Sequence, residues 1–366
     1  MKTWNIKTPR LVYSGLGSVS KLKDIMEANS AKSAFVVLDR GLEGTCFETK
    51  LKLALEGYET TCWDGFSTNP SVIQCEDGVE CFRRNKGDIV IAAGGGSAID
   101  AAKYILMNSG FQTFVAIPTT CGTGAECSPF AIIKETEPLR KAAISHERFI
   151  PEYVILDPQS LVSLSREMIA ATAMDTLAHG IEVHISKNAD SLVRISTRGS
   201  LDTIFRHMER AVFDRDMESL EALQNVAFTA RLLYPRTGLS IAHSLAHPLG
   251  AITDWHHGII IALLLPQTLI FNKGYCQEFL GEINGILSLN DGRKTDIIEW
   301  IEDIAHRSEM FKHLNASGYP LEELAIDRIA KEAMKSSNIA SNPREISSSE
   351  ELKEVLVESL KKIKVR

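Results

Sequence analysis

Short apolar runs alternate with helical patterns through the first part of the chain. Each run is rich in β-branched residues and is followed by a turn. The runs are Ser33–Asp39, Gly87–Ala93, Thr113–Pro118 and Tyr153–Asp157. Strands that are apolar along their whole length are typical of a parallel sheet covered on both faces. The pattern therefore predicts βα units and an α/β domain with a parallel, Rossmann-like sheet.

After Pro158 the pattern changes to helical spacing, and strand-like runs are nearly absent. Four segments carry this spacing: Ser165–Ser186, Ser191–Ala211, Leu220–Leu233 and Thr295–Lys312. A chain of 366 residues is long for one core. We expect an α/β domain over residues 1–158 and an all-helical domain over residues 159–366. No linker is evident, so the cleft between closely packed domains is the default ligand site.

Composition narrows the class of protein. The net charge is −7, and 44% of the residues are hydrophobic. Scattered basic residues argue against a nucleic-acid partner. The N-terminus lacks the apolar core of a signal peptide, and the longest apolar stretch, Ile259–Pro266, is too short to cross a bilayer. Seven cysteines without a C-x-x-C pair fit reduced thiols. We expect a cytoplasmic protein that binds neither nucleic acid nor membrane.

Two glycine-rich turns follow predicted strands. Gly94–Ser97 opens a helix, where backbone N–H groups and the helix dipole favour a pyrophosphate. It is not the G-x-G-x-x-G fingerprint, and a tight βα turn is an equal alternative. Pro118–Glu126 adds hydroxyl and amide donors. Both turns would lie at the carboxyl edge of one sheet, where α/β proteins bind ligands, and together they favour a dinucleotide.

Charged residues near these turns refine the cofactor prediction. Asp39 ends an early strand, where its carboxylate could accept from a ribose 2′-hydroxyl and favour NAD(H). A turn-forming Asp is the alternative, and Arg40 could instead bind the 2′-phosphate of NADP(H). Asp100 and Lys103, in the helix after the first turn, are expected to be capping or surface charges.

Histidines gather in the helical half. Asp175 and His179 lie four residues apart on one helix face, and His243 and His247 repeat that spacing. A further segment, Asp254–Gly258, contains two adjacent histidines. The neighbours are apolar, so these polar rings need partners. One carboxylate with several imidazoles suits Fe²⁺ or Zn²⁺ better than Mg²⁺ or Ca²⁺. A single histidine of this kind is more often structural, but the clustering predicts a metal site.

The motifs in order are GGGS, PTT-x-GTG-x-E, MD-x-L-x-H, H-x-x-x-HP and HHG. In this order the sequence resembles the iron-containing (group III) alcohol dehydrogenase family. The resemblance runs from the opening TPRLVYSGLGS to Asn342-Pro343-Arg344. It implies the dehydroquinate synthase-like fold, in which a nucleotide-binding α/β domain precedes a helical metal domain.

The resemblance also implies roles for individual residues. The implied metal ligands are Asp175, His179, His243 and His257. His247 is implied as a pocket histidine beside the metal and a candidate proton relay, whereas His256 matches no motif position. The implied cofactor contacts are Asp39, Asn69, Gly95, Gly96, Ser97, Thr119, Thr120, Thr123 and Lys141. For Lys141, a surface charge is a fair alternative.

Two stretches depart from the family pattern on the expected substrate side: Tyr234–Thr237 and His184–Asn188. Cys121, near the expected nicotinamide, replaces a commoner alanine. Simple alcohols or diols are therefore doubtful substrates. We hypothesise that Arg236 pairs with a phosphonate, sulfonate or carboxylate on the substrate. A helix-surface arginine is the plainer interpretation.

The function implied is a metal-dependent, NAD(P)-linked alcohol dehydrogenase or aldehyde reductase acting on a small molecule, with a homodimer as the family-level expectation. A dehydroquinate synthase-like lyase would need several Lys or Arg residues for its acidic substrate. A polyol dehydrogenase of the same superfamily usually has fewer imidazole ligands. A catalytically silent binding protein in a biosynthetic cluster is the alternative from another class, and the intact ligand set argues against it.

Overall fold

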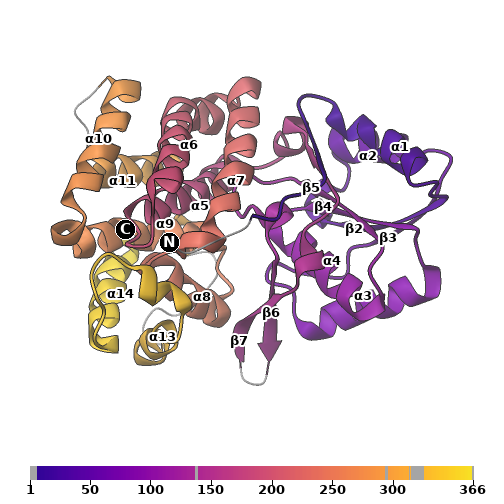
Figure 1. The fold of residues 1–366 in the computed structure, drawn as a ribbon. Helices are drawn as coiled ribbons and strands as arrows, with labels where there is room; N and C mark the ends of the chain where they lie inside the picture. Colours follow the sequence, from indigo (N-terminus) through magenta and orange to yellow (C-terminus); the bar gives the residue numbers. More distant parts are fainter. Residues whose placement is uncertain (1–5, 137–138, 293–295, 313, 315–324, 365–366) are drawn as a thin grey trace. The chain divides into compact units, whose positions relative to one another are not determined.

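The computed structural model describes residues 6–136, 139–292, 296–312, 314 and 325–364 (Figure 1). The chain divides into two compact units, Met1–Leu164 and Ser165–Arg366. The boundary predicted after residue 158 falls at the start of η5 (Pro158–Leu161). The first unit contains a parallel sheet and the second is helical in its described part, so the predicted fold class is confirmed.

The sheet of the first unit has six parallel strands in the order β1-β8-β5-β4-β2-β3. The strands are β1 (Leu11–Ser14), β2 (Ser33–Leu38), β3 (Glu59–Trp63), β4 (Ile89–Gly94), β5 (Thr113–Pro118) and β8 (Tyr153–Leu156). The apolar runs of the sequence are β2, β4, β5 and β8. These strands are buried almost throughout because helices cover both faces.

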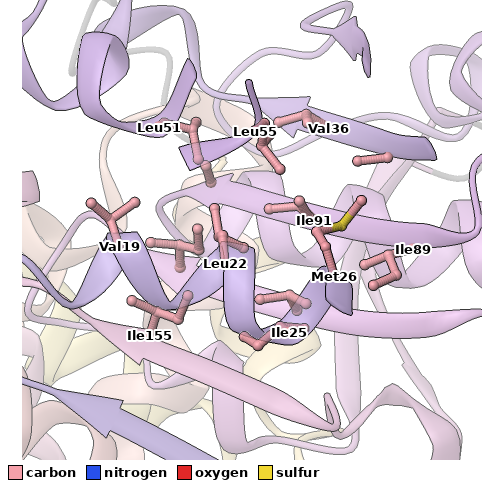
Figure 2. Close-up of a cluster of buried hydrophobic side chains, with 14 of the residues drawn as sticks. Val19, Leu22, Ile25, Met26, Val36, Leu51, Leu55, Ile89, Ile91 and Ile155 are labelled. Atoms are coloured by element: carbon pink, nitrogen blue, oxygen red, sulfur yellow. The ribbon is translucent and has the colours of Figure 1, made fainter. Parts of the chain in front are cut away.

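Four helices cover this sheet: α1 (Lys21–Ala28), α2 (Cys46–Ala54), α3 (Val72–Asn85) and α4 (Gly96–Ser109). Figure 1 shows α1 and α2 on one face and α3 and α4 on the other. Figure 2 shows the core under α1, where Leu22, Ile25 and Met26 pack with strand residues such as Ile91. On the opposite face, Phe35 of β2 meets Phe82 of α3 edge to face.

An antiparallel hairpin, β6 (Phe130–Thr136) with β7 (Leu139–Ser145), follows the second glycine-rich turn. It is tied to α4 by two buried charged side chains. Lys103 is fully buried, and its Nζ donates to the carbonyl oxygens of Ala125, Ser128 and Phe130 at 2.7–2.8 Å. Asp100 accepts from the backbone N–H of Ile132 at 3.1 Å. The expectation that Asp100 and Lys103 are surface or capping charges is therefore wrong.

The second unit is built from helices. They are α5 (Arg166–Ile185), α6 (Ser191–Glu209), α7 (Met217–Thr237), α8 (Ile241–Thr253), α9 (His257–Asn272), α10 (Gln277–Asp291), α11 (Ile297–Arg307), α13 (Ile326–Ala333) and α14 (Ser349–Lys364). Every residue of α5 from Ile169 onward is buried, because α6, α7 and α9 all pack against it. A helix enclosed on all sides shows no apolar stripe.

Helix α9 is the most apolar part of the described chain. With η7 (Lys273–Tyr275) it is long and apolar enough to cross a membrane by length and composition. Two thirds of that stretch is buried, however, and α5, α8, α11 and α14 pack around α9. It is therefore placed as a core helix, and its apolar length follows from enclosure by neighbouring helices.

The Lys103 contacts lead to a stability prediction. In Lys103→Met, three buried carbonyls lose their donor, and we expect the free energy of unfolding to fall by on the order of 3 kcal/mol. Urea denaturation of the full chain measures this change. Lys52→Met removes an exposed lysine that pairs with Glu48 and should change little. If Lys103→Met unfolds at the same urea concentration as the wild type, the buried contacts of Lys103 contribute nothing to the free energy of unfolding.

Candidate metal centre and nucleotide-binding loops

Helix α5 provides one wall of a buried polar cluster. The helix begins at Arg166 after the N-cap residue Ser165, whose side chain accepts from the N–H of Met168. From this start, Asp175, His179 and Glu182 follow at intervals of four and three residues and so share one helix face. All three side chains are buried. Charged and polar groups buried this deeply need partners or a bound ion.

Helices α8 and α9 bring imidazoles to the same place. His243 Nε2 lies 3.3 Å from Asp175 Oδ1, and His257 Nε2 lies 3.5 Å from the same oxygen. His179 Nε2 is 4.0 Å from it. Ligand atoms of Asp175, His179 and His243 all lie within 4.8 Å of one another. Three of the four predicted ligands thus form a compact group, and His257 reaches its carboxylate.

The other two histidines of these segments differ in position. The ring of His247 stacks on that of His257 at 5.7 Å between centroids and lies 6.5 Å from that of His243. It therefore adjoins the cluster, where the resemblance predicts a proton relay. His256 is the N-cap residue of α9.

Two atoms of the cluster mark a place for a cation. Asp175 Oδ1 and His243 Nε2 are buried and have no hydrogen-bond partner within the part of the chain that the structure describes. Leaving such atoms unsatisfied costs free energy unless something binds them. One carboxylate oxygen with imidazole nitrogens is a donor set that Fe²⁺ and Zn²⁺ accept. The residues present therefore fit a divalent transition-metal ion.

The charges of the cluster agree with this fit. Burial opposes ionisation of Asp175, but the adjoining His179, His257 and His243 outweigh it and hold the carboxyl pKa well below its ordinary value. Burial also keeps the pKa of His179 well below the ordinary value. For His243 burial is again the largest effect, yet the combined influence of Glu182 and Asp175 raises its pKa to about 9. The carboxylate thus stays ionised and available as a ligand.

Glu182 is a candidate site residue that belongs to none of the motifs found in the sequence. One of its oxygens accepts from the N–H of Ala242 at 3.1 Å, and the other bonds Nδ1 of His243. This contact fixes the ring so that Nε2 points to Asp175. Carboxylates that orient metal-binding imidazoles in this way are common. The spacing from His179, three residues along one helix face, was the signal that could have revealed it.

The position of His257 depends on its neighbour. A Cβ at Gly258 would lie 2.1 Å from the carbonyl oxygen of Ala171 on α5. No side chain fits there, so only glycine allows the start of α9 to approach α5 this closely. The approach brings His257, the first residue of α9, to Asp175.

In the first unit the two glycine-rich turns lie together. The register pairs Gly94 with Pro118 at the ends of β4 and β5. Gly95 is the N-cap of α4, and a Cβ there would lie 3.1 Å from Thr120. A Cβ at Gly96 would lie 2.9 Å from Thr123. Glycines here let the second glycine-rich turn pack directly against the start of α4.

Two of the predicted cofactor contacts, Asp39 and Asn69, lie outside the two glycine-rich turns. Asp39 follows β2 and accepts from the N–H of Gly41 at 2.8 Å. Asn69 has a φ of 58° and donates its backbone N–H to Ser97 Oγ at 3.3 Å. Its buried Nδ2 has no hydrogen-bond partner among the described residues.

Four further positions complete the placement. Thr119 is buried, and its N–H donates to the carbonyl of Gly94 at 3.1 Å. Cys121 is buried in the same turn. Lys141 is half-buried on β7, opposite Lys134. Arg236 lies in α7, but its side chain lies outside the described residues.

Comparisons with known proteins match both units. The model of the family "Iron-containing alcohol dehydrogenase" matches residues 9–158, and that of "Fe-containing alcohol dehydrogenase family, C-terminal" matches residues 169–360. A 1,3-propanediol dehydrogenase from Klebsiella pneumoniae is 28% identical, with 92% of this chain and 94% of that protein covered.

Two solved structures are similar over almost all of both chains. One is a 1,3-propanediol oxidoreductase, with a TM-score of 0.88, 25% identity and coverage of 98% of this chain and 100% of that one. The other is the sulfoacetaldehyde reductase of Bifidobacterium kashiwanohense in complex with NAD⁺, with a TM-score of 0.82, 25% identity and coverage of 98% and 99%.

The contact between Glu182 and His243 can be tested by metal binding. In Glu182→Gln the ring of His243 loses its charged partner, and we expect the affinity for Fe²⁺ or Zn²⁺ to fall about 10- to 100-fold. Titration against a chelator measures this. Glu358→Gln, at an exposed residue of α14, is the matched control. Equal metal affinity in both variants would exclude an orienting role for Glu182.

The close approach at Gly258 gives a second test. Gly258→Ala forces α9 away from Ala171, so we expect His257 to shift and the purified protein to lose most of its metal. Elemental analysis measures the content. Gly285→Ala on α10 is the control, since a Cβ there meets nothing within 4 Å and alanine favours the helix. A full metal content in Gly258→Ala would contradict the steric assignment.

Proposed function

The chain belongs to the iron-containing alcohol dehydrogenase family, and from this premise we propose that it interconverts a small aldehyde and its alcohol with a divalent metal ion and NAD(H). The observation that carries the proposal is the buried group of Asp175, His179 and His243, whose ligand atoms converge within 4.8 Å. The family match over both units favours this dehydrogenase over the lyase, polyol dehydrogenase and binding-protein alternatives.

For the metal we propose Fe²⁺, with Zn²⁺ as the alternative, held by Asp175, His179, His243 and His257. When bound, such an ion acts as a Lewis acid on the carbonyl or alkoxide oxygen. Glu182 holds the ring of His243 in position through Nδ1. We propose that His247, whose ring stacks on that of His257, passes the alcohol proton.

For the cofactor we propose NAD(H) rather than NADP(H). The NAD⁺ complex of the similar sulfoacetaldehyde reductase supports this choice. Arg40, the residue that could bind a 2′-phosphate, is paired with Asp64 at 3.1 Å, while Asp39 lies at the strand end where a ribose acceptor is expected. The proposed contacts are Asp39, Asn69, Gly95, Gly96, Ser97, Thr119, Thr120, Thr123 and Lys141.

We propose that the substrate is a small aldehyde carrying a carboxylate, sulfonate or phosphonate. The sulfoacetaldehyde reductase among the similar structures supports this class, since its named substrate is a sulfo-aldehyde. Arg236 stays a proposed contact, because its side chain is not described. We also propose that the protein is a cytoplasmic homodimer.

The proposed function is tested by metal analysis of protein purified without chelator, together with NADH and NADPH oxidation over neutral and anionic aldehydes. Asp175→Asn removes the charged ligand, and we expect it to lose the metal and more than about 1,000-fold in kcat/KM. Asp202→Asn, at a half-buried residue of α6 paired with Arg206, should keep both the metal and the activity. Wild-type protein that contains no metal and oxidises neither cofactor would refute the proposal.

A further inference from the structure

An arginine reaches the proposed metal-binding cluster from a fourth helix. Arg231 lies on α7, which packs against α5. Its Nη1 is 3.3 Å from Nε2 of His179. The residue is half-buried, so its guanidinium lies at the edge of the buried group rather than out in solvent. It belongs to none of the motifs found in the sequence.

The charge of Arg231 is unusual at this place. A guanidinium keeps its positive charge at any ordinary pH, and the proposed ligands beside it bind a divalent cation. Two carboxylates, Asp175 and Glu182, contact His243 and can balance the two charges of such an ion. Arg231 adds a positive charge beside these groups. A guanidinium at the edge of such a site favours an anion among its small ligands.

The hydrogen bond of Arg231 also favours an anionic ligand. The guanidinium donates to a lone pair on His179 Nε2, and a metal bound through that nitrogen uses the same lone pair. Arg231 must then give up this acceptor while its charge stays next to the ion. Its planar fork of N–H donors matches carboxylate, sulfonate and phosphonate oxygens.

We propose that Arg231 is the residue that selects an anionic aldehyde at this site, an inference that rests on the proposed function. Nitrogen ligands lie about 2 Å from a bound metal, so Nη1 would be within about 5.5 Å of the ion. A carbonyl oxygen at the metal and an acid group at Arg231 are then separated by a short spacer. The substrate class is a two-carbon aldehyde with its sulfonate or phosphonate on the carbon next to the carbonyl.

The experiment compares sulfoacetaldehyde with propanal, a neutral aldehyde of similar size, in wild-type protein and in four variants: Arg231→Gln, Arg231→Lys, Arg236→Gln and Arg206→Gln. A second measurement needs no turnover: calorimetric binding of ethanesulfonate to the metal-loaded protein without nicotinamide. Arg206→Gln on the exposed face of α6 is the control. Metal content is determined for every sample.

In Arg231→Gln we expect kcat/KM for sulfoacetaldehyde to fall on the order of 100-fold, mainly through KM. The value for propanal should stay within about threefold, because a neutral substrate makes no charged contact. Ethanesulfonate binding should weaken to a similar extent as sulfoacetaldehyde, and Arg231→Lys should recover part of both. Arg206→Gln should behave as wild type.

Several results overturn the inference while leaving the proposed function intact. One is a wild-type enzyme that reduces propanal as efficiently as sulfoacetaldehyde. Another is an equal fall in kcat/KM for both substrates in Arg231→Gln. A third is unchanged binding of ethanesulfonate in that variant. If Arg236→Gln, and not Arg231→Gln, lost the activity with sulfoacetaldehyde, the other arginine of α7 would be the residue that selects the anionic substrate. If metal is bound but no aldehyde turns over, the proposed function fails and ethanesulfonate binding still decides the role of Arg231.

Discussion

The burial of one ionised carboxylate organises the helical unit. Asp175 sits in a helix enclosed on all sides, where a charge is tolerated only if opposite charge or a bound cation surrounds it. Imidazoles from α5, α8 and α9 supply that surrounding. Glu182 and Gly258 serve the same requirement, one by a hydrogen bond and the other by the absence of a side chain.

Patterns that depend on near neighbours in the sequence were predictable. The apolar runs gave β2, β4, β5 and β8, and the spacing of Asp175 to His179 and of His243 to His247 placed each pair on one helix face. The resemblance then supplied a ligand set drawn from separate helices, and the structure brings its members together.

Features set by distant contacts were not predictable from one sequence. Lys103 looks like an ordinary surface lysine until the segment from Ala125 to Phe130 folds against α4 and brings three carbonyl oxygens to its amine. Arg231 lies in a helical segment whose spacing does not reveal that it faces His179. In each case the contact partner lies more than twenty residues away along the chain. Local periodicity reports only on near neighbours, so it does not predict burial or charge contacts that depend on such distant residues.

The contact of Lys103 with the backbone also bears on how a nucleotide would be received. The amine of Lys103 holds the segment from Ala125 to Phe130 against α4, so protein contacts already fix the shape of that segment without a ligand. Binding a dinucleotide here would then cost less free energy for ordering the loop. More of the free energy of its contacts would remain as binding affinity than in sites built from mobile glycine loops.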